Sequence, residues 1–283
     1  EDNEEYLRSF GDAANCCDCG VCEMFACPMG LSPRKVNGYI KGEPSVNGVP
    51  ASATSLDATG NVIGQPTGRA MTIQGSSDIT VEHMNISSFL RGIVMGDSEK
   101  ITISDNEIHH LRKTAIMGDA DDLVIEGNYL HSSNPWRIGE PGGDHADFIA
   151  LWSDARQVGA TTNVTIRDNV LSQGDGGRIL GMWLAGNGDG YKNVIIEGNA
   201  ILGGDHQGIM LTNVVDGIVR DNTLLQTTSY AKSPGILLRT GTKNIEVSDN
   251  LTWSVADAEK GGTGNTITDN ILIQKTNPLA GGF

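Results

Sequence analysis

One short motif recurs along most of this 283-residue chain: an alternating apolar run, then in most copies Asp-Asn or Gly-Asn, then another apolar residue. Its copies end at Asn85, Asn106, Asn128, Asn169, Asn199, Asn222, Asn250 and Asn270. Successive asparagines are 21, 22, 41, 30, 23, 28 and 20 residues apart. A minimum spacing near 21 with occasional longer steps indicates one coil of a solenoid per repeat, with insertions in particular turns.

A second short apolar strand lies between the asparagine motifs, for example at residues 92–95, 148–151 and 208–211. Because like motifs recur in the same order, the strands can stack in parallel, each coil ~4.8 Å from the last. The asparagines then form a hydrogen-bonded ladder inside a turn, and the alternating apolar residues point into the core. The sequence therefore predicts an all-β fold, a right-handed parallel β-helix over residues 70–283. With Asn85 and Asn250 inside the ladder, their N-x-S/T sequons are not expected to carry glycans.

The composition agrees with this fold and narrows the partners. The chain has 37 glycines and few aromatics, which suits many short strands joined by tight turns. The formal net charge of −15 argues against nucleic acid and anionic membranes as partners. No apolar run approaches the ~20 residues of a membrane span, and the acidic N-terminus is not a signal peptide. We therefore expect a cytoplasmic protein, or one given without its targeting segment.

The repeated strands and their asparagine ladder resemble the pectate-lyase-like superfamily of right-handed β-helices. That superfamily includes polysaccharide lyases, glycoside hydrolases, uronate epimerases and phage tailspikes. The resemblance implies a polysaccharide partner bound along one sheet and, because such enzymes are usually exported, a secreted or periplasmic location. It is specific for fold and not for reaction.

The two longest steps, 41 and 30, point to the coils that carry function, since long turns on a rigid scaffold are its usual carriers. Segments 144–152 and 175–183 align there at an offset of 31, which matches Leu151 with Met182 and Trp152 with Trp183. Segment 204–211 continues the column. The two tryptophans are predicted to stack one coil apart, as a sugar platform or as core filling, and Trp136 in the long insertion is the better platform.

Polar residues recur where these strands begin. The predicted column of strand-entry residues consists of Arg91, Lys113, Asp147, Arg178 and Gln207, with His145 and His206 beside it and Asp144, Asp175 and Asp205 in the preceding turns. His145 and Asp147 are two apart, so on a strand they face the same way and suit an acid/base pair, although a hydrogen-bonded turn is the alternative. The segment His145–Ile149 also resembles a motif of bacterial β-helix proteins. Arg178 is expected one coil from Asp147, where a plain salt bridge is the alternative role.

Two reactions fit these residues. A lyase or epimerase removes the proton next to a uronate carboxyl, with His145 or Lys113 as base, Arg178 as neutralising group and Ca²⁺ at the three aspartate turns. A glycoside hydrolase needs two carboxylates, which neighbouring coils would supply from Asp144, Asp147, Asp175 and Asp205. The basic residues favour uronate chemistry, with His206 as a further catalytic candidate and Arg91, Trp136 and Gln207 as substrate-binding ones. A non-catalytic glycan-binding β-helix is the alternative outside catalysis.

All five cysteines lie near the N-terminus, and Cys16, Cys19, Cys22 and Cys27 are spaced by two, two and four residues before a proline. With the following Met-Gly-Leu-Ser-Pro this run is similar to the iron–sulfur region of Rnf-type electron-transport C subunits and their propanediol-utilisation relatives. The resemblance implies a [4Fe–4S] cluster and electron transfer; zinc held by the four thiolates is the lesser alternative. Segment 1–43 is therefore separated from a linker or first-coil region at 44–69, and its abrupt end suggests a fused, misassembled or remnant segment.

Overall fold

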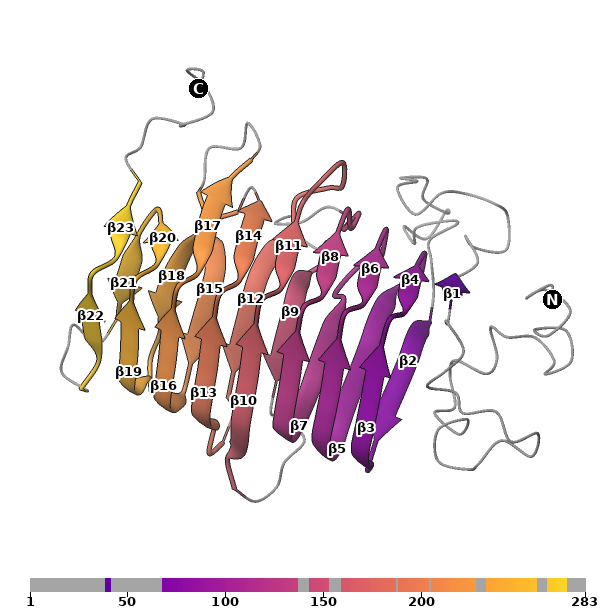
Figure 1. Cartoon of the computed structure of the whole chain (residues 1–283), viewed down its shortest axis with the longest axis horizontal. Coiled ribbons are helices and arrows are strands. Elements are labelled where there is room, and N and C mark those ends of the chain that lie inside the picture. The colour runs from indigo at the N-terminus through magenta and orange to yellow at the C-terminus, as the bar shows by residue number, and fades with distance from the viewer. Residues whose placement is uncertain are drawn as a thin grey trace, which may run out of the picture.

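The computed structural model describes residues 68–136, 143–152, 159–186, 188–203, 205–227, 233–258 and 264–273, and the backbone of 39–41. These residues form coils of three strands that stack along one axis (Figure 1). All pairings between the described strands are parallel. The predicted all-β, parallel β-helix is confirmed.

Each coil contributes one strand to each of three faces. The first face consists of β2 (Arg69–Gln74), the first halves of β5 (Arg91–Ser104) and β7 (Ile116–Glu126), β9 (Asp147–Trp152), β12 (Leu180–Ala185), β15 (Gln207–Thr212), β18 (Gly235–Leu238) and β21 (Val255–Asp257). The second consists of β3 (Ser77–Glu82), the second halves of β5 and β7, β10 (Thr161–Arg167), β13 (Tyr191–Glu197), β16 (Val214–Arg220), β19 (Lys243–Ser248) and β22 (Thr266–Thr268). The third consists of β1 (Tyr39–Lys41), β4 (Asn85–Ser87), β6 (Glu107–His109), β8 (Tyr129–His131), β11 (Val170–Ser172), β14 (Ala200–Gly203), β17 (Thr223–Gln226), β20 (Leu251–Thr252) and β23 (Ile271–Leu272).

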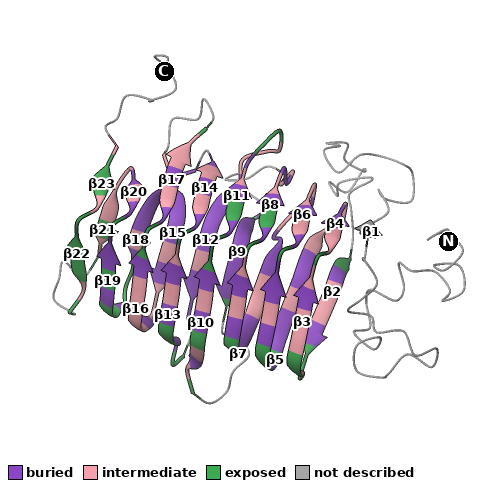
Figure 2. Cartoon of the chain, in the orientation of Figure 1, coloured by how far each residue is buried: buried purple, intermediate pink, exposed green. Residues whose placement is uncertain are grey.

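Alternation of apolar and polar residues along the strands fills the interior with stacked aliphatic side chains. Buried residues accordingly recur along the strands of successive coils (Figure 2). One fully buried column on the first face consists of Ile93, Ile116, Ile149, Met182, Ile209 and Ile236, each paired in register with the next. Burial of each such side chain contributes ~1.5–3 kcal/mol. The repeat therefore fixes the core, and the core fixes the register of every strand.

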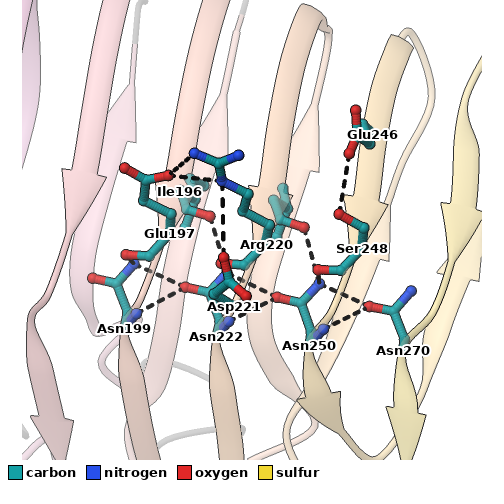
Figure 3. Close-up of polar contacts among 11 residues, drawn as sticks. Ile196, Glu197, Asn199, Arg220, Asp221, Asn222, Glu246, Ser248, Asn250 and Asn270 are labelled. Carbon is teal, nitrogen blue, oxygen red and sulfur yellow. Dashed lines mark hydrogen bonds and ion pairs between the residues drawn. The ribbon is translucent and has the colours of Figure 1, made fainter.

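The asparagine ladder forms at the turn between the second and third faces. The Nδ2 atom of Asn222 donates to Asn250 Oδ1 at 2.9 Å and to the Ile196 carbonyl of the preceding coil at 2.9 Å. The same bonds recur along the column (Figure 3), where each asparagine also accepts the backbone N–H of the previous one. Because these amides are buried and fully bonded, the ladder joins coil to coil as predicted.

Asn85 is not part of this ladder, which corrects the sequence-based assignment. The ladder position in its coil belongs to Met84, whose backbone N–H donates to Asn106 Oδ1 at 3.0 Å. Asn85 lies one residue further on, where its side chain donates to Glu107 Oε2 at 2.7 Å. Asn85 is only half-buried, so its sequon is not protected by the ladder as Asn250 is.

The long strand β7 contains a close approach that only glycine allows. Gly118 has a φ of +109°, and a Cβ at this position would lie 1.9 Å from the carbonyl oxygen of Met95 in the previous coil. The pairing of β5 with β7 shifts register in the same place, between Met95 and Ser98. The corner between the first two faces is therefore built on a glycine.

Toward the N-terminus the backbone of β1 pairs with β4, with Tyr39 opposite Asn85. The cysteines at 16, 19, 22 and 27 lie outside the described residues, as does most of the predicted 44–69 linker. Within the described part of the chain, no helix is long and apolar enough to span a bilayer.

Candidate active site

The entry ends of β9, β12 and β15 bring several predicted site residues together. Asp147 is the first residue of β9, and Gln207 is the first residue of β15, two strands away. The Gln207 amide nevertheless reaches Asp147, donating from Nε2 to Oδ1 at 3.2 Å. The buried amide thus ties two coils together at the base of the site.

Asp147 is a buried carboxyl group that titrates near neutrality. Its side chain is 1% exposed. Burial, together with the nearby negative charge of Asp205, raises the pKa of Asp147 to about 7. A carboxyl group that holds its proton up to neutral pH is a frequent component of catalytic sites.

His145 lies above this carboxyl group with its ring in solvent. Its side chain is 60% exposed, and its Nδ1 lies 3.8 Å from Asp147 Oδ2. The imidazole packs edge-on against the Trp183 indole, with ring centroids 5.2 Å apart and planes at 85°. Partial burial, and then the charge of Lys113, lower the pKa of His145, so the ring is neutral at pH 7. A neutral, accessible imidazole oriented from behind by a carboxyl group has the form of a general base.

A second histidine and carboxylate, those of His206 and Asp205, lie just before β15 begins. Asp205 is almost fully buried and binds two partners, the Arg178 guanidinium and the His206 ring. Burial alone would raise the pKa of Asp205, but the hydrogen bonds from Arg178 and His206 outweigh it and lower the pKa. The Asp205 carboxylate therefore stays ionised, while Asp147 keeps its proton.

Arg178 pairs with Asp205 and not with Asp147, which corrects the partner expected from sequence. In the observed register Asp147 lies opposite Leu180, two residues after Arg178. Arg178 thus precedes the strand and points toward the turn of the next coil. The salt bridge expected for Arg178 exists, with a different aspartate.

Asp144 anchors the other side of the site. It accepts bonds from Arg112, from Nε at 2.8 Å and from Nη2 at 3.0 Å, and its Oδ1 lies 2.9 Å from Lys113 Nζ. The Trp136 N–H also donates to it at 2.8 Å. Burial would raise the pKa of Asp144, but these bonds outweigh it and lower the pKa. Asp144 therefore ties the end of the long insertion to its beginning, because it binds the backbone N–H of Trp136.

Arg112 and Thr114 are site residues that the sequence analysis missed. Arg112 forms the bidentate contact with Asp144, and Thr114 Oγ1 accepts the backbone N–H of Asp147 at 3.5 Å. Both flank Lys113, which sequence alignment had placed in the column. The signal that points to Arg112 and Thr114 in the sequence is their position just before the buried residues Ala115 and Ile116.

The three aspartate turns do not gather into a calcium site. Asp144 and Asp205 are each bound by basic side chains, whereas Asp175 is 80% exposed and lies 3.9 Å from His110 on another face. Among the described residues, no three His, Cys, Asp or Glu side chains are arranged to hold a metal ion. The calcium ligand set proposed from spacing is therefore not assembled by the fold.

The predicted offset of 31 between the two aligned segments is two residues short. Leu151 pairs with Leu184 and not with Met182, and Trp152 pairs with Ala185. Trp152 and Trp183 consequently meet diagonally, with centroids 6.2 Å apart and planes tilted by 39°. Trp152 is 39% exposed, so the pair forms part of the surface beside His145 and is not core filling.

Arg91 completes a locally positive region. Its pKa is lowered by burial and by Arg69, and it is close enough to Asp144 and Arg112 to interact with both. Arg112 and Lys113 pair with Asp144, with which Arg91 also interacts, and Arg178 pairs with Asp205, so four cationic side chains accompany two ionised carboxylates. Two positive charges are left in excess on a chain whose net charge is −15.

Comparison with known proteins defines the class that this fold represents. A family model described as the right handed beta helix region matches residues 72–272, most of the chain. The protein belongs to this right-handed β-helix family, and the predicted handedness is confirmed. The match does not extend to the N-terminal cysteines.

Two solved structures are similar to this chain. One is an alginate lyase from Paenibacillus sp. str. FPU-7, with a TM-score of 0.40 and 9% identity over 76% of this chain and 85% of that one. The other is the Dettilon tailspike protein (gp208), with a TM-score of 0.34 and 13% identity over 75% of this chain and 54% of that one. At these identities the likeness concerns the fold alone. No curated protein matches the chain.

Proposed function

We propose that this protein is a polysaccharide lyase or epimerase that acts on a uronate-containing glycan, with His145 as the base. The observation that carries the proposal is an exposed, neutral imidazole whose Nδ1 faces the buried Asp147 carboxyl. Once Asp147 is ionised, its carboxylate attracts the ring proton of His145 to Nδ1, and Nε2 is then the nitrogen that takes a proton from substrate. Such a base contributes typically 10²–10⁴-fold to rate.

The positive excess around His145 supports a uronate as substrate. Removal of the proton beside a carboxylate builds up negative charge on that carboxylate, which nearby cations stabilise in the transition state. Lys113 and Arg178 are 24% and 29% exposed, so their charged ends are within reach of a bound glycan. Trp152 and Trp183 offer an apolar surface for the sugar ring.

In the lyase reaction, His145 takes the proton from the carbon bearing the carboxylate, and the bond from the neighbouring carbon to the glycosidic oxygen breaks. The electron pair of the C–H bond forms a carbon–carbon double bond, and the departing oxygen takes up a proton. In the epimerase reaction no bond to oxygen breaks, and a proton returns to the same carbon from the opposite face. His206, beside Asp205 just before β15, is the candidate donor for that return.

A glycoside hydrolase is the second candidate, favoured by one observation. Asp147 and Asp205 have pKa values shifted in opposite directions, as the acid and the base of such enzymes do. Both side chains are however only 1% exposed. Since a hydrolase needs both carboxyl groups against the sugar, their burial favours roles behind the histidines.

A panel of uronate-containing and neutral polysaccharides tests the proposal. A lyase raises both the ultraviolet absorbance of unsaturated uronate and the number of reducing ends, whereas an epimerase raises neither and changes the proton spectrum of the uronate. Reducing ends without absorbance would establish the hydrolase instead. Glycan binding with none of these changes would establish a binding module.

A further inference from the structure

Three histidines gather on the third face, away from the proposed active site. His109 ends β6, His110 follows it, and His131 ends the neighbouring strand β8. The rings of His109 and His131 stack with centroids 5.0 Å apart and planes at 7°. The Nδ1 atoms of His109 and His110 are only 2.6 Å apart.

Asn85 fixes which nitrogen of His109 carries the proton. Its Nδ2 donates to Glu107 Oε2 at 2.7 Å, so its Oδ1 is the atom that faces His109 Nε2 at 3.0 Å. A carbonyl oxygen only accepts, so the proton is on Nε2 and the lone pair of the neutral ring is on Nδ1.

Asp175 lies near the other ring nitrogen of His110, Nε2. Its Oδ1 lies 3.9 Å from His110 Nε2, and a carboxylate likewise attracts a proton to the nitrogen that faces it. The two Nδ1 atoms face each other across 2.6 Å, and the one on His110 can carry a proton that it donates to the lone pair of the one on His109. A metal ion that displaces this shared proton would be bound by both nitrogens.

We propose that the Nδ1 atoms of His109 and His110 bind one divalent transition metal ion of the class of Zn²⁺, Ni²⁺ or Cu²⁺. Imidazole nitrogen suits these ions. A metal-ligating histidine usually donates its other N–H to a carbonyl or carboxylate, and Asn85 and Asp175 lie at those two positions. Solvent completes the coordination, because both nitrogens of His131 are engaged by Glu107 and Ser132.

The geometry requires a small movement of the pair. A tetrahedral ion with ~2.0–2.1 Å bonds holds two nitrogens about 3.3 Å apart, so the rings must separate by several tenths of an ångström. His110 can supply this movement, because its side chain is 44% exposed. The proposed site has only two protein ligands. It is therefore not a cluster of three or more His, Cys, Asp or Glu side chains, and the described residues contain no such cluster arranged for a metal ion.

Calorimetric titration of the full chain with ZnCl₂ at pH 7.5 tests the site. The five cysteines are alkylated in every sample so that thiolates do not compete, and folding is checked by circular dichroism. His110→Asn is compared with the control His83→Asn. Both histidines have positive φ, which asparagine tolerates, and both are exposed enough to be replaced.

We expect one Zn²⁺ per chain at this site, at least tenfold weaker binding in His110→Asn, and unchanged binding in His83→Asn. Asn85→Leu leaves both ligands in place and should weaken binding 10–100-fold, because it removes the partner of His109 Nε2–H. Equal binding by the wild type and His110→Asn, or no binding by the folded wild type, would overturn the proposal.

Discussion

Replacement of Asp147 by asparagine should make the protein more resistant to rising pH. The pKa of Asp147 is raised from 3.8 to about 7 in the folded state. At 1.36 kcal/mol per unit, ionisation of the folded protein costs about 4 kcal/mol more than ionisation of the unfolded chain. The folded protein therefore keeps a proton that the unfolded chain releases between about pH 4 and pH 7.

The sign follows from this difference in bound protons. The stability that Asp147 contributes is complete below about pH 4, falls as the pH rises to about 7 and is constant above that value. The asparagine side chain of the variant cannot ionise and still accepts the bond from Gln207 Nε2. The free energy of unfolding of Asp147→Asn, minus that of wild type, should therefore increase by about 4 kcal/mol between pH 4 and pH 8.

Urea unfolding followed by circular dichroism at intervals of half a pH unit measures this difference. Asp175→Asn is the matched control, because that carboxylate is 80% exposed and its pKa is lowered by the Ser132 hydrogen bond. The control should show no such gain at high pH. A difference for Asp147→Asn that is independent of pH, or that declines as pH rises, would refute the assignment of Asp147 as a buried, protonated carboxyl.

Three other predictions concern the ladder, the corner and the base. Asn222→Ala should lower the free energy of unfolding in urea by ~3–5 kcal/mol, since it removes the five hydrogen bonds of this side chain and leaves the buried Asn199 N–H without its acceptor. Asn85→Ala, off the ladder, should cost under about 1 kcal/mol, and equal costs would contradict the ladder assignment. Gly118→Ala should yield little folded protein by circular dichroism, because its Cβ meets the Met95 carbonyl; a stable variant would show that the corner relaxes. His145→Gln should lower kcat at least 10²-fold on the glycan identified by the panel, and full activity would remove His145 as the base.

The sequence was sufficient for the fold because the repeat encodes register directly. Stacked asparagines and aliphatic residues must match from coil to coil, so the motif specifies both the turn and the strand that follows it. Asn85 was misplaced because Val81-Glu-His-Met aligns with Ile103-Ser-Asp-Asn, and Met84 takes the ladder position. The positive φ shared by His83 and Asp105 marks the true alignment, and this conformation is not visible in a sequence.

The site was only partly predictable, since its register depends on loop lengths. Segments that share tryptophans were aligned at the tryptophans, but Trp152 and Trp183 meet diagonally. Asp147 and Gln207 were correctly placed in one column, whereas Arg178 reaches a different carboxylate in the next turn. The partner that a side chain as long as arginine binds depends on local geometry, which strand spacing alone does not determine.

Proton spectra of a uronate glycan, recorded during incubation with the protein in D₂O, test the proposed chemistry most directly. We expect loss of the proton on the carbon next to the carboxylate, with either a new vinyl signal or deuterium in its place, and no such loss with His145→Gln. Cleavage of the glycan with that proton intact, or the same exchange in the variant, would contradict it.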